Sequence, residues 1–183
     1  MSRIFSQVLC LAIIAFFMGQ AKAQTGSFDV IDYDARIEPD MTSKSVKGKV
    51  SIRFSSLKNN LSEIHLSAGV LEIDAAREGK TALKFEKRER VLIISLPRPA
   101  KFGEKREIEI EYHGAPRFGI RFFPDERQVY TLFSTSQWMP CVDSPDDRAT
   151  FRLNLILPKD LKAAGNGRFI RERALPDNKI SSE

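Results

Sequence analysis

Apolar and polar residues alternate with a period of two along most of the chain. In residues 31–38 the odd positions are apolar and the even positions are polar or charged, which is the pattern of a half-buried β-strand. Residues 46–54 repeat it, with Gly48 on the apolar face, where a bulge or the close approach of another backbone is expected. The short connection 41–44 predicts that these two strands form an antiparallel hairpin.

The same period predicts shorter strands further along, separated by turn residues. They cover residues 63–67, 70–75, 82–86, 91–96, 104–112, 129–133, 149–157 and 169–174. Pro97 and Pro99 are expected to end the fourth of these, and residues 117–128 form a loop or irregular hairpin. Residues 104–112 could instead be an exposed helix, but their β-branched residues favour a strand. No segment predicts a helix of three turns. The expected fold class is all-β, a mostly antiparallel β-sandwich or saddle-shaped pair of sheets, and beyond Pro176 we expect only a polar tail.

Residues 1–23 have the three parts of a secretory signal peptide. Arg3 lies in a short basic region, residues 8–18 are an apolar run, and Ala21-Lys22-Ala23 resembles a cleavage site. The run of eleven residues is shorter than the roughly 20 that a membrane-spanning helix needs. We therefore expect cleavage after Ala23, export to the periplasm or the extracellular space, no membrane anchor after cleavage, and one domain over residues 24–183.

Charge and cysteine content exclude some classes of partner. The formal charge of +5 falls to +3 without the leader, because Arg3 and Lys22 are lost and 27 basic residues remain against 24 acidic ones. The two signs are interleaved, as in residues 86–90, so we expect no nucleic-acid partner and no binding to anionic membranes. Cys141, the only cysteine of the mature chain, has no internal disulfide partner and is expected to be a partly buried, inert thiol.

Candidate catalytic residues are few. His65 and His113 are the only histidines, 48 positions apart in different predicted strands, and no His-Glu-x-x-His helix supplies zinc ligands. Cys141 has no histidine nearby in the sequence, and Ser134 and Ser136 lie in no nucleophile elbow. The residues alone therefore predict an exported, non-catalytic all-β domain without a metal site.

The stretch from Trp138 to Phe151 is the most distinctive part of the chain. Its two prolines restrain themselves and the residues before them, and residues 144–147, Ser-Pro-Asp-Asp, predict a tight turn. A tryptophan in so rigid a segment predicts a loop packed onto the body of the domain.

Residues 140–151 also closely resemble the Pro-Cys-x-Asp-x-Pro-x-x-Lys-Ala-Thr-Phe signature of the N-terminal domain in the aminopeptidase N family of zinc metallopeptidases. The residues that carry the resemblance, with Arg148 in place of Lys and Trp138 just upstream, are Pro140, Cys141, Asp143, Pro145, Ala149, Thr150 and Phe151. Residues 28–34, 46–52 and 157–167 are similar to further segments of that domain. The resemblance implies a β-domain that caps a thermolysin-like catalytic domain, in which these signature residues are structural.

The resemblance also implies where substrate and zinc would bind. In the family, a glutamine or glutamate just upstream of the signature reaches the pocket for the first side chain of the substrate, and Gln137 is the counterpart here, with a shorter spacing to Pro140. The family's Gly-x-Met-Glu-Asn and His-Glu-x-x-His motifs do not occur in this sequence. We therefore expect no catalytic residue and no cofactor in this chain, and zinc only in a separate catalytic domain.

Three functional interpretations follow. The chain is a truncated N-terminal domain, incomplete at its C-terminal end and without peptidase activity of its own. Alternatively, it is the N-terminal part of a working zinc aminopeptidase whose catalytic domain lies in cis or is encoded downstream. The third interpretation is a stand-alone exported β-domain that binds a partner protein through the loop around Trp138.

Overall fold

The structure is a computed structural model that describes residues 26–183; the predicted leader, residues 1–23, lies outside the described residues. The described part contains thirteen strands and one turn of 3₁₀ helix, η1. Their bounds are β1 (Phe28–Asp40), β2 (Ser45–Ser56), β3 (Leu61–Ser67), β4 (Glu72–Glu78), β5 (Thr81–Ala82), β6 (Phe85–Arg88), β7 (Val91–Ala100), β8 (Lys105–Gly114), β9 (Ile120–Phe123), β10 (Gln128–Thr131), η1 (Thr135–Gln137), β11 (Thr150–Pro158), β12 (Glu172–Leu175) and β13 (Lys179–Ser182). Within residues 26–183 no helix has the length and hydropathy of a membrane span.

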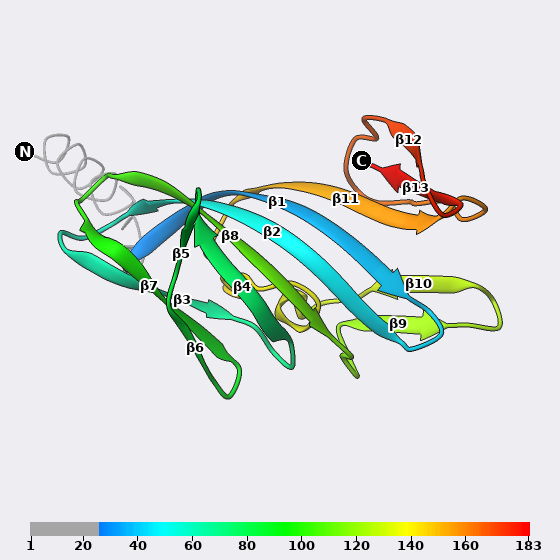
Figure 1. Cartoon of the computed structure of the whole chain (residues 1–183), viewed down its shortest axis with the longest axis horizontal. Helices are drawn as coiled ribbons and strands as arrows, with labels where there is room; N and C mark the ends of the chain where they lie inside the picture. The colour runs from blue at the N-terminus through cyan, green and yellow to red at the C-terminus, as the bar shows by residue number, and fades with distance from the viewer. Residues whose placement is uncertain (1–25) are drawn as a thin grey trace, which may run out of the picture.

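The strands form one large sheet and two small ones (Figure 1). The large sheet has eight strands in the order β12-β13-β11-β1-β2-β8-β4-β5, while β3-β7-β6 and β10-β9 form sheets of three and two strands. Strands β1 and β11 pair in parallel, and every other strand pair of the described residues is antiparallel. The predicted all-β, mostly antiparallel fold is therefore confirmed.

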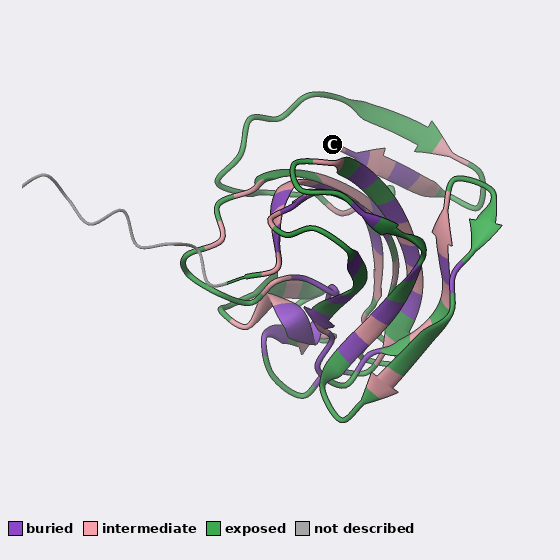
Figure 2. Cartoon of the chain, turned by 90° about the vertical axis from the view of Figure 1, so that its left-hand side faces the viewer, coloured by how far each residue is buried: buried purple, intermediate pink, exposed green. Residues whose placement is uncertain are grey.

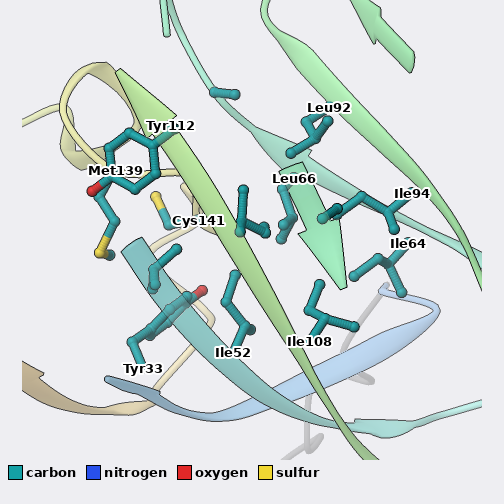
Figure 3. Packing of buried hydrophobic residues seen from close by; sticks show 14 of the residues in the cluster. Tyr33, Ile52, Ile64, Leu66, Leu92, Ile94, Ile108, Tyr112, Met139 and Cys141 are labelled. Atoms are coloured by element: carbon teal, nitrogen blue, oxygen red, sulfur yellow. The ribbon is translucent and has the colours of Figure 1, made fainter. Parts of the chain in front are cut away.

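The core lies on the inner face of the curved eight-stranded sheet (Figure 2). Ile52 and Ile108 from this face pack toward the three-stranded sheet, which contributes Leu66 and Ile94 (Figure 3). The stretch from Trp138 to Phe151 is called the signature loop below. At the other end of the same face, Met139 of this loop lies beside Tyr112 (Figure 3). One continuous core is thus shared by the eight-stranded sheet, the three-stranded sheet and the signature loop, as expected for a β-sandwich.

The first hairpin follows the alternating pattern. Strands β1 and β2 are antiparallel neighbours, and Tyr33, Ala35 and Ile37 are buried as predicted. The expected inward position of Ile31 is wrong, because a bulge between Val30 and Asp32 shifts the register and turns Val30 inward instead.

Several strand limits differ from the prediction, and three of the differences change how the strands are arranged. Strand β7 continues through Pro97 and Pro99, because both lie where its register against β3 jumps from Ser95 to Ala100, so no ladder hydrogen bond needs their missing N–H. The single strand predicted over 82–86 is two strands, β5 and β6, which belong to different sheets. The tail expected to be without regular structure forms β13, which pairs with both β11 and β12.

Gly48 marks a close approach, as its position in the pattern indicated. The neighbour is a side chain and not a backbone: Gly48 lies opposite Tyr112 in the β2–β8 register, and a β carbon at this position would collide with the Tyr112 ring. The glycine therefore makes room for a fully buried tyrosine in the core.

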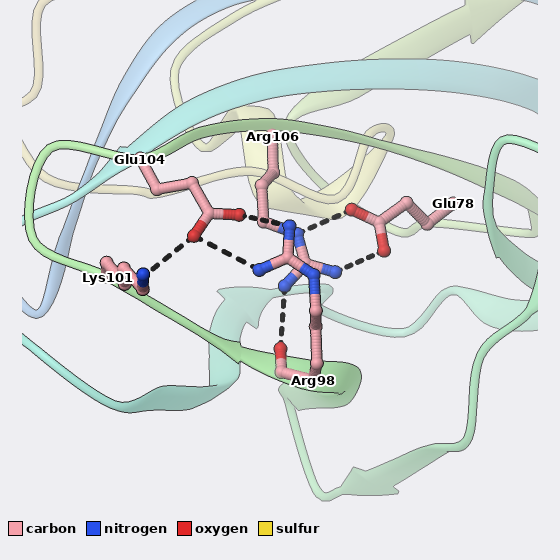
Figure 4. A network of polar contacts seen from close by, with 5 residues as sticks. All are labelled: Glu78, Arg98, Lys101, Glu104 and Arg106. Atoms are coloured by element: carbon pink, nitrogen blue, oxygen red, sulfur yellow. Dashed lines mark hydrogen bonds and ion pairs between the residues drawn. The ribbon is translucent and has the colours of Figure 1, made fainter.

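A buried charge ties the two main sheets together (Figure 4). Arg106 of β8 has a side chain that is only 4% exposed. It donates to Glu78 of β4 and to the carbonyl of Arg98 in β7, the latter at 2.7 Å. The Arg98 side chain in turn pairs with Glu104, which also accepts from the Lys101 backbone N–H. This network joins β4 and β8 of the large sheet to β7 of the three-stranded sheet.

Candidate functional site

The signature loop is fixed to both main sheets by backbone hydrogen bonds. Cys141 and Ser67 exchange N–H···O bonds of 3.0 and 2.8 Å, which attaches the loop to the end of β3. The next residue, Val142, donates its N–H to the Tyr33 hydroxyl of β1 at 3.0 Å. Burial raises the pKa of Tyr33 above its ordinary value, so this hydroxyl remains neutral at physiological pH.

The acidic residues of the loop accept hydrogen bonds that shape it. Asp143 accepts from the Ser136 hydroxyl at 2.6 Å, and Asp147 accepts from the Val30 N–H at 3.4 Å. The predicted tight turn is present, since the Asp147 N–H donates to the Ser144 carbonyl at 3.2 Å. Burial raises the pKa of Asp147, and the nearby Asp29 carboxylate acts in the same direction. These contacts support a structural role for both aspartates.

The remaining signature residues divide between core and surface. Trp138, Pro140 and Cys141 are buried, and burial raises the pKa of the Cys141 thiol to about 12. A thiol with so high a pKa is almost entirely protonated at neutral pH and is a poor nucleophile.

The signature residues that follow join the loop to the sheet. Thr150 donates its hydroxyl to the Ile31 carbonyl at 3.4 Å, and Phe151 lies opposite Tyr33 in the β1–β11 register. Ala149 packs against the core, whereas Pro145 and Arg148 are exposed. The loop therefore leads into β11 at the position where that strand first pairs with β1.

Gln137, the candidate substrate-binding residue, is enclosed in the structure. Its exposed fraction is 3%, and two glycines with positive φ lie against it. A β carbon on Gly69 would lie 2.6 Å from the Gln137 amide nitrogen, and one on Gly119 would lie 2.9 Å from the Gln137 β carbon. The side-chain carbonyl oxygen is buried without a hydrogen-bond partner. Other residues of the domain therefore shield the Gln137 side chain almost completely from solvent.

The backbone just before η1 is strained. Phe133 and Ser134 both have left-handed φ values, 52° and 40°, which side chains with a β carbon rarely adopt. The Gln137 N–H donates to the Ser134 carbonyl at 3.1 Å, and the Leu132 N–H donates to the Gly119 carbonyl at 2.9 Å. These bonds hold the turn and leave Phe133 on the surface.

The two histidines lie apart from this loop and from each other. His113 contacts Asp74 at 2.9 Å at the end of β8, and this hydrogen bond raises the pKa of His113. His65 pairs with Glu63 on β3. Residues 26–183 contain no group of three or more His, Cys, Asp or Glu side chains placed to hold a metal ion.

A polar groove of about 420 Å³ lies across strands β11, β1, β2 and β8. Four of its charged groups form ion pairs, Arg53 with Asp32 and Arg152 with Asp34 at 3.0 Å, and Glu107 of β8 also lines it. In each of these ion pairs, the two partly exposed side chains compensate each other's charge. Both arginines of the groove are therefore already engaged by carboxylates of β1.

The comparison with family models decides the family. Residues 30–183 match the model of the peptidase M1 N-terminal domain. The chain belongs to the peptidase M1 family. No curated protein matches it. The family assignment agrees with the resemblance carried by the signature loop.

Solved M1 structures share the fold of this M1 domain. One is a variant of the M1 zinc metallopeptidase from Deinococcus radiodurans bound to a Tyr-Ser-Ala substrate, with 24% identity and a TM-score of 0.77. Another is a two-domain M1 zinc metallopeptidase bound to L-tryptophan, with 23% identity and a TM-score of 0.78. Each match covers 85% of this chain and 38% of the other. The M1 domain thus spans well under half the length of these proteins.

Several residues that form the site were not identified by sequence reasoning. Gly69 and Gly119 enclose Gln137 from segments far from it in the chain, and Tyr33 holds the loop from β1. A positive-φ turn at Phe133 has no sequence signal, because neither Phe nor the following Ser favours it. Only the glycines could have been singled out, as positions where close backbone approach is possible.

Proposed function

We propose that this chain is the exported N-terminal β-domain of a zinc aminopeptidase-like protein of the M1 family, without peptidase activity of its own because the zinc-binding and amine-binding motifs do not occur in its sequence. The observation that carries the proposal is the family match over residues 30–183. Most signature residues support it, because they make hydrogen bonds within the domain or pack in its core instead of converging on a reaction centre.

The electrostatics of the loop also support a non-catalytic role. General acid–base or nucleophilic catalysis needs a titratable group near neutral pH within reach of a substrate. The Cys141 thiol is buried with a pKa raised to about 12, and both histidines lie in exposed pairs with carboxylates. Neither the thiol nor the histidines therefore supply such a group to the loop.

The biochemical test uses the purified mature chain, residues 24–183. We expect less than stoichiometric zinc by atomic absorption and no hydrolysis of aminoacyl anilides. The M1 zinc metallopeptidase from Deinococcus radiodurans, measured in parallel, is the positive control. Turnover by the mature chain that a chelator abolishes would overturn the proposal.

A working aminopeptidase with its catalytic domain in cis or encoded downstream is the second candidate. It is favoured by the coverage, since the M1 domain matches only 38% of the solved metallopeptidases. Sequencing the DNA that follows the codon for Glu183 separates the candidates. In-frame Gly-x-Met-Glu-Asn and His-Glu-x-x-His motifs would establish the second candidate, and their absence would leave the first.

Export is the remaining part of the proposal and rests on the signal-peptide pattern of residues 1–23. Expression of the whole chain with a C-terminal tag should yield a periplasmic or secreted product that begins at Gln24, as read by N-terminal sequencing. A product that retains Met1 and stays in the cytoplasm would contradict export.

A further inference from the structure

Asn166 is the only asparagine of the chain that is followed by glycine. The others, Asn59, Asn60, Asn154 and Asn178, precede residues that carry a side chain. The backbone nitrogen of the next residue can attack the side-chain amide of an asparagine, and a side chain on that next residue hinders the approach. Gly167 has none, and it gives the backbone the freedom to close the five-membered ring that the attack forms. Local sequence therefore resists this reaction least at Asn166.

The fold adds no restraint at this position. Asn166 and Gly167 lie in the connection from β11 to β12, where residues 161–171 form no helix or strand (Figure 1). The Leu161 N–H donates to a carbonyl of β11 at one end, at 3.0 Å, and the Ile170 N–H donates to the carbonyl that follows β13 at the other, at 2.7 Å. Between these bonds, residues 163–169 are exposed and make no hydrogen bond within residues 26–183.

The backbone on both sides of Asn166 lies in open space. A β carbon added to Gly165 or to Gly167 would have no atom within 4 Å, so nothing packs against the segment in which the ring must form. Two other asparagines are held by hydrogen bonds: Asn154 accepts from the Ser181 hydroxyl at 2.9 Å, and Asn59 accepts from a backbone N–H at 3.1 Å. Dipeptide sequence, exposure and lack of restraint thus coincide at Asn166.

We propose that Asn166 and Gly167 form a site of spontaneous deamidation in the folded protein. The Gly167 backbone nitrogen loses its proton and attacks the side-chain carbonyl carbon of Asn166. A new C–N bond closes a succinimide ring, the bond from that carbon to the side-chain nitrogen breaks, and the nitrogen leaves as ammonia with the proton. Water then opens the ring at either carbonyl, which gives aspartate or, where the chain continues through the side chain, isoaspartate. Isoaspartate is the substrate class of protein isoaspartyl methyltransferases.

The product places a negative charge beside a free cation. Arg168 follows the pair directly and forms no ion pair within residues 26–183, so its guanidinium is available to the new carboxylate. Isoaspartate also lengthens the main chain, but surface connections tolerate such changes. We therefore expect the modified domain to stay folded. The inference does not depend on the proposed function.

The test follows the native mature chain, Gly167→Ala and the matched control Gly165→Ala during incubation in mildly alkaline buffer. Both glycines lie in open space without a positive φ, so both variants should fold like the native chain. Only Gly167 supplies the attacking nitrogen. Peptide mass mapping locates the mass gain of about one dalton, and an isoaspartyl methyltransferase with a labelled methyl donor measures isoaspartate.

We expect isoaspartate at position 166 in the native chain and in Gly165→Ala at equal rates. Formation in Gly167→Ala should be at least about tenfold slower, because the added methyl group hinders ring closure. The native chain in urea is the reference for an unrestrained segment. Its rate should lie within about tenfold of the rate in the folded protein, because little free energy is needed to open a segment without hydrogen bonds.

A larger difference between the folded and the urea-unfolded chain would overturn the inference, because the fold would then protect Asn166. A smaller difference between the native chain and Gly167→Ala would also overturn it, since ring closure would not be the route. Isoaspartate that forms first at another asparagine would place the reactive site elsewhere.

Discussion

Gln137 packs closely against two glycines, which have no side chains to keep it at a distance. Gly69 approaches its amide from the end of β3, and Gly119 approaches its aliphatic part from the segment before β9. The buried carbonyl oxygen of Gln137 has no hydrogen-bond partner, and an unsatisfied acceptor of this kind costs about 1–3 kcal/mol. The packing against two glycines therefore has to offset a polar penalty, and the position should be sensitive to a single added methyl group.

Replacing Gly69 by alanine tests this packing, and Gly79→Ala is its matched control. Both glycines have positive φ, 43° and 57°, so both variants carry the left-handed penalty of about 1–2 kcal/mol. Only at Gly69 would the new β carbon also meet the Gln137 amide, whereas nothing lies within 4 Å at Gly79. We expect Gly69→Ala to lower the free energy of unfolding by about 1–3 kcal/mol more than Gly79→Ala, measured by urea denaturation. Equal losses would mean that Gln137 is free to move away.

At the scale of elements, Arg106 connects strands that belong to different sheets. Its guanidinium binds Glu78 of β4 on one side and the β7 carbonyl of Arg98 on the other. A buried guanidinium is stable only while its partners remain, because an unpaired charge in the interior carries a large desolvation cost. The pair thus specifies how the strands meet more than it adds to stability.

Glu78→Ala should therefore destabilise the domain by at least about 2 kcal/mol, and the double variant with Arg106→Met should recover part of that loss. The control is Glu86→Ala, which breaks the exposed Arg88–Glu86 pair, with side chains 68% and 58% exposed, and should have little effect. Guanidinium denaturation of the four proteins provides the comparison. A double variant less stable than Glu78→Ala would show that Arg106 contributes independently of its charge partner.

At the scale of the whole molecule, the three sheets and the signature loop share one core. The cluster of buried side chains runs from Phe28 in β1 through Leu92 in β7 to Trp138 in the loop. A domain of this size with a single core is expected to unfold cooperatively. The loop should lose its packing together with the sheets and not before them.

Trp138 reports on this directly, because it is the only tryptophan and its exposed fraction is 8%. We expect blue-shifted emission that is protected from acrylamide, and a denaturation transition by fluorescence that coincides with the one by far-ultraviolet circular dichroism. An earlier fluorescence transition would mean that the loop detaches first. Emission like that of tryptophan in water would favour the interpretation of the loop as an exposed binding segment.

The sequence by itself determined most of the strands, the tight turn and the burial of Trp138. Alternation with a period of two depends only on which face of a strand is buried, so it is readable from local residue order. The turn at residues 144–147 follows from the preferences of Ser, Pro and Asp. The family resemblance of residues 140–151 is likewise a property of the sequence, and the match over residues 30–183 confirms it.

Only the tertiary structure decided which segments meet. The parallel pairing of β11 with β1, the membership of β5 and β6 in separate sheets, and the pairing of β13 depend on contacts between residues far apart in the chain. The enclosure of Gln137 by Gly69 and Gly119 has the same origin. The left-handed backbone of Phe133 does too: the Leu132 N–H donates to the distant Gly119 carbonyl, and the missing β carbon of Gly119 leaves room for the Ser134 carbonyl, although the local preference of Phe133 disfavours this conformation.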